Sequence, residues 1–352
     1  MSNALIIRAD SSIAMGTGHV MRCLALAEAW RDAGGSCAFV MSSPAPPIRE
    51  RLRAEKCEVF PLNSRAGSEE DARELVNLSR SLGSDFVVVD GYQFGDHYQE
   101  YIKAQGLALL FVDDNGHAGR YSADVVLNQN AHASADLYRK RAPYTELLLG
   151  LKYAMLRREF TRWKTWKRRI VSVGRNVLVT LGGSDPENVT ASVVRALRRV
   201  DVDPLSVKVL IGASNPHCLS VTQELSRLKS QFEIVSNTDD ISKLMAWADF
   251  AISGAGSTCW EMCFMGLPAI ILPIAENQWR SAEKLDAIGA AKLIPKPERA
   301  SNILTKHIEQ LLLSHAERES MSRVARTLVD GEGASRVVHS IREIGVHAPC
   351  HG

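Results

Sequence analysis

"IRADSSIAMGTGHVMRCLALAEAW", residues 7–30, joins a short apolar run to a segment of helical period through a turn with two glycines and a histidine. A strand that enters a glycine-rich turn and then a helix usually indicates a phosphate-binding loop. From Val20 to Ala33 the apolar residues recur at helical spacing, and Gly34 follows where the helix should end. This stretch predicts a buried strand, a loop that ends in His19, and an amphipathic helix.

The same alternation of strands and helices continues along the whole chain. Further strand-length apolar runs are "CAFVMSS", "DFVVVDGY", "LALLFVDD", "ADVVLNQN", "NVLVTLGG", "VKVLIGAS", "FEIVSN", "FAISGAG", "AIILPIAENQ" and "AAKLIP". Their near-continuous Val, Leu and Ile content predicts parallel strands that helices cover on both faces. We therefore expect an α/β protein with a first domain at 1–160, a linker at 161–174, a second domain at 175–335, and a helix end and tail at 336–352.

Composition restricts the class of protein. The 352 residues carry a formal net charge of only +2, which favours neither nucleic acid nor an anionic membrane as the partner. The basic stretch at 157–169 is interpreted as a solvated helix face. Seven cysteines without a C-x-x-C pair fit core thiols in a reducing compartment. The sequence shows no signal-peptide pattern. Its longest apolar runs are far shorter than the roughly 20 residues that span a bilayer, so we expect a cytoplasmic protein.

The first glycine loop departs from the familiar nucleotide motifs. Met21 stands where a dinucleotide fingerprint has its third glycine, and the second strand lacks the acidic end that would hold a ribose. No G-K-[ST] sequence occurs anywhere in the chain, so a Walker loop is absent. We expect no NAD, FAD or other cofactor.

Two glycine-rich turns in the second half each follow a strand and precede a helix. "LGGSDPEN" places Ser184 or Asp185 at a helix N-cap, with Pro186 at the first helical position. "SGAGSTCWE" begins another helix, and backbone amides at helix N-termini bind anions. Together the two turns favour a nucleotide diphosphate. Glu261 has two interpretations that the spacing leaves open: the partner of Thr258 in a capping box, or the acceptor for a ribose diol.

Polar residues also follow several strands. Examples are Asn277-Gln278 after "PIAE", Asp90-Gly91-Tyr92, Asp113-Asp114 and Asn128-Gln129-Asn130. Ligands of open α/β sheets bind beyond the carboxyl ends of the strands, where amides can contact sugar hydroxyls or an N-acetyl group. We expect no metal site, because adjacent carboxylates on a strand point apart and no second group stands at ligand spacing.

Five segments together resemble a known family: "RADSSIAMGTGHVMRCLALA", "LNQN", "YAMLRREF", "VTLGGSDPENVT" and "MAWADFAISGAGSTCWEMCFMGLPAIILPIAENQ". They look like the bacterial nucleotide-sugar hydrolases of pseudaminic acid biosynthesis, which act on UDP-2,4-diacetamido-2,4,6-trideoxy-β-L-altropyranose. The second half also resembles the N-acetylglucosaminyl transferase that makes lipid II. The resemblance implies a GT-B fold, with two Rossmann-like parallel-sheet domains that face each other across a cleft. One departure is visible at Asp90-Gly91-Tyr92. The family usually has Asp-His-Tyr there, so Gly91 stands in the place of a histidine.

The resemblance also implies roles for individual residues. His19 matches the general base, Glu261 the ribose acceptor, and the backbone near Thr238 the uracil contact. The diphosphate would be held by Gly254, Gly256, Ser257 and Thr258. The sugar would be contacted by Gly16, Gly18, Asp90, Tyr92, Asn277 and Gln278.

The chemistry that this site requires is limited. A water made nucleophilic by His19 would attack the anomeric carbon with inversion, and the diphosphate leaves without the acid that glycosidases need. The positive end of the helix dipole keeps His19 a neutral proton acceptor. A GT-B glycosyltransferase with an unknown acceptor and a non-catalytic nucleotide-sugar sensor are the alternatives. The expected partner is a UDP-sugar, with no nucleic acid, membrane or obligate protein partner.

Overall fold

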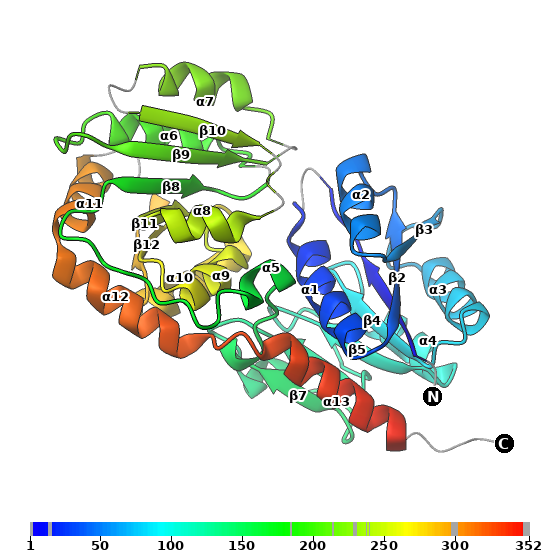
Figure 1. Cartoon of the computed structure of the whole chain (residues 1–352). Coiled ribbons are helices and arrows are strands. Elements are labelled where there is room, and N and C mark those ends of the chain that lie inside the picture. The colour runs from blue at the N-terminus through cyan, green and yellow to red at the C-terminus, as the bar shows by residue number, and fades with distance from the viewer. Residues whose placement is uncertain are drawn as a thin grey trace. The chain divides into compact units, whose positions relative to one another are not determined.

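The computed structural model describes residues 3–12, 16–183, 185–212, 215–227, 231–236, 238, 240–296 and 302–347, with side chains up to 344. The chain divides into unit 1, residues 1–158 with 332–352, and unit 2, residues 159–331. The segment 161–174, expected to be a linker, therefore lies within unit 2. The C-terminal helix returns to unit 1 (Figure 1).

A parallel sheet forms the centre of unit 1. Its strands are β1 Ala4–Ala9, β2 Ser36–Ser42, β3 Glu58–Leu62, β4 Phe86–Asp90, β5 Ala108–Val112, β6 Val125–Asn128 and β7 Glu146–Leu149. The strands lie in the order β3-β2-β1-β4-β5-β6-β7, so the chain runs outward from β1 to β3 and then returns to β4 on the other side of β1. This doubly wound order has its topological switch point between β1 and β4, where such sheets bind ligands.

Helices of unit 1 cover both faces of this sheet (Figure 1). They are α1 Gly18–Asp32, α2 Pro46–Ala54, α3 Glu69–Ser81, α4 Asp96–Ala104 and α13 Gly333–His347, with short 3-10 helices at Ala135–Tyr138 and Leu151–Tyr153 and the short helix α5 Arg158–Thr161 at the unit boundary. The helix predicted from Val20 is α1, which begins two residues earlier. Val20 and Leu24 of α1 share one apolar core with Val337 and Ile341 of α13. A Cβ on Gly333 would lie 2.2 Å from a backbone oxygen, so this glycine allows α13 to start close to the chain beneath it.

Unit 2 repeats the doubly wound pattern. Its strands are β8 Asn176–Thr180, β9 Ser206–Ile211, β10 Gln231–Ser236, β11 Phe250–Ser253, β12 Ala269–Ile271 and β13 Lys292–Leu293. Their order is β10-β9-β8-β11-β12-β13, all parallel, with the switch point between β8 and β11. Its helices are α6 Val189–Leu197, α7 Cys218–Leu225, α8 Ile241–Trp247, α9 Thr258–Met265, α10 Trp279–Ala287, α11 Asn302–Leu313 and α12 His315–Leu328, with a 3-10 turn at Glu276–Gln278.

The α/β class and every strand predicted from the sequence are confirmed. Two strands, β3 and β7, were not predicted, and both lie at the edges of their sheet. β3 contains Pro61, which cannot donate a ladder hydrogen bond and is tolerated in sheets mainly at an edge. β7 begins with the exposed Glu146. Edge strands need not be apolar on both faces, so the rule of continuous apolar runs misses them.

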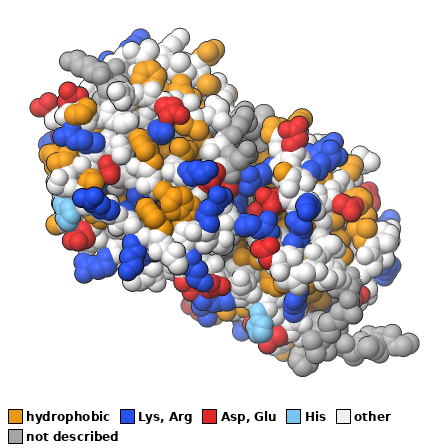
Figure 2. Space-filling model, in the orientation of Figure 1, with side chains coloured by type: hydrophobic (Ala, Val, Ile, Leu, Met, Phe, Trp, Pro, Cys, Tyr) orange, Lys and Arg blue, Asp and Glu red, His pale blue; other side chains and the backbone are white. Residues whose placement is uncertain are grey.

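The basic stretch at 157–169 is solvated as expected at most of its basic positions, but only Arg158–Thr161 is helical and Arg168 is half-buried. The Arg168 guanidinium lies 5.0 Å from the centre of the Trp166 ring, and burial lowers the pKa of Arg168 to about 9. Trp163 donates from Nε1 to Ser242 Oγ at 2.8 Å. Arg168 also donates to the backbone oxygens of Met245, Ala248 and Met265. Elsewhere Figure 2 shows basic and acidic side chains interspersed on the face in view. Within the described residues, no helix combines the length and apolar character that crossing a membrane requires.

A buried ion pair ties β1 to α3. Arg8 donates from Nε to Asp71 Oδ1 at 3.0 Å and from Nη2 to Asp71 Oδ2 at 2.9 Å, and both side chains are fully buried. Asp71 also accepts from the Gly67 backbone N–H and from the Tyr98 hydroxyl. Arg8 Nη1 also lies 2.7 Å from Asp10 Oδ1, so removing Asp71 leaves the buried guanidinium with Asp10 as its carboxylate partner and leaves the Gly67 N–H and the Tyr98 hydroxyl without their acceptor.

We predict that Asp71→Ala lowers the free energy of unfolding by about 3–5 kcal/mol, the usual cost of breaking a buried ion pair. Glu69→Ala is the matched control, because Glu69 lies on the same helix in an exposed pair with Arg73 and should change stability by less than about 0.5 kcal/mol. Urea unfolding of both variants measures the difference. Equal losses for the two variants would contradict the prediction.

Candidate functional site

The switch point of unit 1 brings His19 and Asp90 together. His19 is the second residue of α1, which follows β1, and Asp90 is the last residue of β4. His19 Nδ1 lies 2.6 Å from Asp90 Oδ1. Asp90 is fully buried, whereas His19 keeps 7% of its surface exposed. The contact therefore forms where parallel α/β sheets bind their ligands.

Arg22 binds both oxygens of the Asp90 carboxylate. Its Nε lies 2.6 Å from Asp90 Oδ2, and its Nη2 lies 2.6 Å from Asp90 Oδ1. Burial alone would raise the pKa of Asp90, but the charges and hydrogen bonds of Arg22 and His19 outweigh it and keep that pKa well below its usual range. Cys23 donates its thiol to the same carboxylate at 3.3 Å. Asp90 is thus a carboxylate at neutral pH.

The closer of two groups near His19 Nδ1 favours one tautomer. Asp90 Oδ1, at 2.6 Å, only accepts hydrogen bonds and favours a proton on Nδ1, whereas Arg22 Nη2, at 3.1 Å, only donates. We assign the proton to Nδ1 because the carboxylate contact is the shorter one. The other ring nitrogen, Nε2, then carries the lone pair that can accept a proton. The pair has the arrangement of a general base oriented by a buried carboxylate. Asp90, expected among the sugar-binding residues, is fully buried and contacts His19 and Arg22.

An aromatic side chain lies beside this pair. The Tyr92 ring packs edge-on against His19, with ring centres 5.1 Å apart, and 37% of its surface is exposed. Its hydroxyl donates to Asp114 Oδ2 at 3.0 Å. Asp114 in turn binds Arg22 Nη1 at 2.8 Å and Asn130 Nδ2 at 2.6 Å. One hydrogen-bonded network thus connects Tyr92, through Asp114 and Arg22, to the partner of His19.

A second imidazole lies on the far side of Tyr92. The ring centres of His117 and Tyr92 are 5.6 Å apart. His117 Nε2 lies 3.0 Å from the Phe94 backbone oxygen and its Nδ1 lies 3.1 Å from Asp113 Oδ2. Burial opposes charging of His117, but the hydrogen bond and charge of Asp113 raise its pKa overall. Protein groups stand close to both ring nitrogens, which favours a structural role for His117.

The glycines near His19 differ in what they require. Gly16 has a φ of +76° and donates its N–H to the Ser12 backbone oxygen at 2.8 Å, so it needs the freedom of glycine. Gly18 begins α1, and a Cβ there would meet nothing within 4 Å. Gly91, which replaces the family's histidine, has a φ of +154°, a conformation that histidine rarely adopts.

In unit 2 the turn after β8 is not the open anion site that was expected. α6 begins at Val189 and its N-cap is Asn188, so the predicted N-cap at Asp185 with Pro186 in the first helical position is wrong. Asp185 is fully buried, and its carboxylate accepts from the Val189 and Thr190 N–H groups at 2.8 Å each. The side chain takes the place of an anion at this helix end. Ser184, the other predicted N-cap, lies outside the described residues.

The turn after β11 has a different structure. Gln278 Oε1 accepts from the Ala255 N–H at 3.1 Å and from the Ile274 N–H at 2.9 Å, which joins the two strand ends. α9 begins at Thr258, and its N-cap Ser257 makes no side-chain capping bond. Within the described part of the chain, no backbone oxygen accepts a hydrogen bond from the N–H groups of Gly256, Ser257 and Thr258. This helix start keeps the arrangement expected for a phosphate.

The start of α9 bears on the two interpretations of Glu261. Ser257 is the N-cap and Thr258 the first helical residue, so Glu261 is the fourth helical residue, one position beyond the third, where a capping box has its Glu. Thr258 and Glu261 therefore do not occupy the two positions of a capping box, and the ribose role of Glu261 stays a prediction. Thr238 follows β10, and its hydroxyl accepts from the Asp240 N–H at 3.2 Å. Asn277 is exposed in the 3-10 turn after β12.

The structure thus groups the predicted residues by unit. His19, Asp90 and Tyr92 lie together in unit 1, and Gly254, Gly256, Ser257, Thr258 and Gln278 lie together in unit 2. Neither Arg22 nor the role of Asp114 was predicted from the sequence. A signal for Arg22 was present, because a residue three positions after His19 lies on the same face of a helix. Among the described residues, no cluster of three His, Cys, Asp or Glu side chains is placed to hold a metal ion.

Comparisons with known proteins agree with this architecture. Residues 176–337 match the glycosyltransferase family 28 C-terminal domain. The crystal structure of Acinetobacter baumannii MurG superposes with a TM-score of 0.67 at 18% identity and covers 97% of this chain and 99% of its own. The fold is therefore GT-B, as the sequence resemblance implied.

Two relatives match along most of their length. The UDP-2,4-diacetamido-2,4,6-trideoxy-beta-L-altropyranose hydrolase of Campylobacter jejuni is 26% identical over 79% of this chain and 94% of its own. The spore coat polysaccharide biosynthesis protein SpsG of Bacillus subtilis is 26% identical over 96% of this chain and 97% of its own. An uncharacterized protein of Methanocaldococcus jannaschii is longer, and the match spans 55% of it. The resemblance to the hydrolases is confirmed.

We predict that the ionised Asp90 makes stability fall in acid. Its pKa is lower in the folded chain than the value of about 3.9 in an unfolded one, so its contribution is complete above pH ~4. Below that pH the unfolded chain binds a proton that the folded chain does not. The free energy of unfolding then falls by up to about 1.4 kcal/mol per pH unit for this group.

Asp90→Asn should remove this part of the acid slope while leaving the remaining slope in place. Urea unfolding at several pH values below about 4 measures it. Identical acid slopes in both proteins would refute the assignment.

Proposed function

We propose that this protein hydrolyses a UDP-linked diacetamido-trideoxy hexose at the anomeric carbon, releasing UDP and free sugar in pseudaminic acid biosynthesis. The observation that carries the proposal is the 2.6 Å contact of His19 Nδ1 with the buried Asp90 at the switch point of unit 1. It leaves one imidazole nitrogen as a proton acceptor. The similarity to a hydrolase named for this substrate supports the choice of reaction.

In the proposed mechanism, His19 Nε2 takes a proton from a water molecule as the water attacks the anomeric carbon. Asp90 stabilises the imidazolium that results, and Arg22 holds Asp90 in place. The diphosphate is already a weak base and leaves without a protonating acid, unlike the leaving group of an ordinary glycoside. Direct attack by one water inverts the configuration of the anomeric carbon.

The nucleotide is assigned to unit 2. The start of α9, with Gly254, Gly256, Ser257 and Thr258, would hold the diphosphate through backbone N–H groups and the helix dipole. The charge that develops on the leaving diphosphate would be stabilised there. Glu261 would accept from the ribose hydroxyls, and the backbone at Thr238 would contact uracil.

Sugar contacts are assigned within each unit separately. Tyr92 offers a partly exposed ring beside His19, and Gly16 and Gly18 allow the sugar to approach the loop. In unit 2 Asn277 and the Nε2 group of Gln278 would contact acetamido or hydroxyl groups. Because Gln278 Oε1 is already bonded to two backbone N–H groups, only its Nε2 is assigned to the sugar.

The test is turnover of the UDP-linked diacetamido-trideoxy hexose without any acceptor. We expect UDP release together with a free sugar of inverted anomeric configuration, followed by NMR. His19→Ala should lower kcat about 10²- to 10⁴-fold, because it removes only the base. Binding of UDP should remain unchanged in this variant.

His97→Ala is the matched control, since His97 is a highly exposed histidine of unit 1 that lies beside Glu100 on α4. It should retain full activity. UDP release that depends strictly on an added acceptor would replace the proposal by a glycosyltransferase. Tight UDP-sugar binding without turnover would replace it by a sensor.

We also predict that Glu261→Gln weakens UDP binding about 10- to 150-fold, as expected for a hydrogen bond to a charged group worth about 1.5–3 kcal/mol. Affinity for inorganic pyrophosphate, which lacks a ribose, should not change. Calorimetric titration with both ligands separates the two effects. Glu276→Gln, an exposed change near the same strand ends, is the control. Equal losses for UDP and pyrophosphate would contradict the ribose assignment.

A further inference from the structure

Two cysteines on neighbouring strands of unit 1 lie in contact. Cys37 is in β2 and Cys57 directly precedes β3, and their Sγ atoms are 2.9 Å apart. The strands pair in parallel with Ala38 opposite Glu58. The residues just before these two are Cys37 and Cys57, which therefore also stand opposite each other. Neighbouring strands lie about 4.8 Å apart, which falls within the ~4.4–6.8 Å between Cα atoms that a disulfide requires. The backbone therefore accommodates a bond between the two sulfurs.

The surroundings of the pair favour oxidation chemistry. The hydrogen bond from the Cys57 thiol lowers the pKa of Cys37, burial opposes this shift, and the Arg31 charge adds to it. The same hydrogen bond, together with burial, raises the pKa of Cys57. The pair thus consists of two sulfurs in contact, one with a lowered and one with a raised pKa, the arrangement of oxidisable dithiols.

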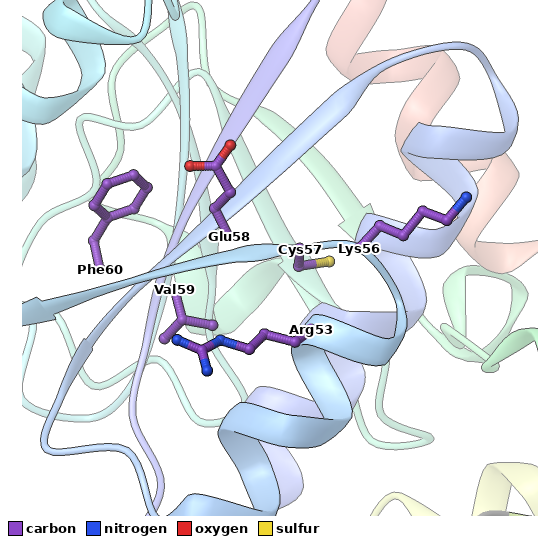
Figure 3. A pocket seen from close by; sticks show the side chains of 6 residues that line it. All are labelled: Arg53, Lys56, Cys57, Glu58, Val59 and Phe60. Carbon is purple, nitrogen blue, oxygen red and sulfur yellow. The ribbon is translucent and has the colours of Figure 1, made fainter.

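A surface hollow of about 380 Å³ reaches Cys57, the neighbour of Cys37. Figure 3 shows the six residues that line it, Arg53, Lys56, Cys57, Glu58, Val59 and Phe60. Cys57 and Cys37 are 3% and 6% exposed, so only a small oxidant can reach the sulfurs. A hydroperoxide such as hydrogen peroxide is of that size.

We propose that Cys37 and Cys57 are a modification site at which a small hydroperoxide closes a reversible disulfide between β2 and β3. The Cys37 sulfur attacks the peroxide, the O–O bond breaks, and a sulfenic acid and one water are formed. The Cys57 sulfur then attacks the Cys37 sulfur, the S–O bond breaks, and a second water leaves. In total two thiols and one hydrogen peroxide give one disulfide and two waters.

The site is independent of the proposed function. Cys37 and Cys57 stand at the amino ends of β2 and β3, whereas His19 and Asp90 stand at the carboxyl ends of β1 and β4. The bond would tie the edge strand β3, and with it α2, to the rest of the sheet. If the disulfide does not form, the hydrolase proposal is unaffected. If the protein does not hydrolyse the UDP-sugar, the disulfide proposal is unaffected.

The experiment treats the native full chain with hydrogen peroxide, blocks the remaining thiols with N-ethylmaleimide after unfolding, and maps tryptic peptides without reduction. Cleavage after Arg31, Arg49, Lys56 and Arg65 places the two cysteines on separate peptides, 32–49 and 57–65. We expect these peptides to be recovered as one cross-linked species, about 2 Da lighter than their sum. Dithiothreitol should separate them.

Cys57→Ser should abolish the cross-linked species, and Cys259→Ser, another buried thiol, should leave it unchanged. The peptide map of the unaltered protein decides the matter even if Cys57→Ser fails to fold. Full alkylation of Cys37 and Cys57, at a peroxide dose that oxidises the exposed Cys218, would overturn the proposal. Recovery of either residue as a sulfinic acid in place of the disulfide would overturn it as well.

Discussion

The Asp90 carboxylate, bound between His19 and Arg22, is the interaction on which the site of unit 1 depends. A fully buried carboxylate must be paired, and here the pairing partner is an arginine on the same helix face as the histidine. Arg22 therefore neutralises the charge by binding both carboxylate oxygens, and His19 shares Oδ1 with Arg22 Nη2. The same arginine reaches Asp114, so the position of Tyr92 is coupled to that of the base.

The two units use their helix starts differently. In unit 2 the buried Asp185 caps α6 with both carboxylate oxygens, which satisfies the amides that a phosphate would otherwise bind. At α9 the N-cap Ser257 makes no such bond, and Gln278 instead stabilises the turn from the side. In unit 1 the start of α1 carries an ionisable side chain. The glycine loop there serves to place His19, through the positive φ of Gly16, and the phosphate is assigned to the other unit.

Much of the fold could be predicted because its strands are buried on both faces and read as continuous apolar runs. The edge strands β3 and β7 escaped prediction because one side of an edge strand needs no partner, and Pro61 is tolerated there. For the site, His19 and the turn after β11 were identified from residue type and spacing. The start of α6 was predicted too early, with Asp185 as its N-cap. Asp185 does bind the first N–H groups of α6, but from the turn before the N-cap residue, and the sequence pattern is the same in both cases.

The sequence by itself determined the α/β class, the two repeated sheets and the residues that could act as base and anion holder, since these depend on local periodicity and residue chemistry. Only the tertiary structure decided what those residues do to one another. Asp90 is 71 positions from His19 and Asp114 is 92 positions from Arg22. Contacts at such separations follow from strand order, which places β4 beside β1. No local pattern encodes that neighbourhood, because it arises when the apolar faces of distant segments pack into one core.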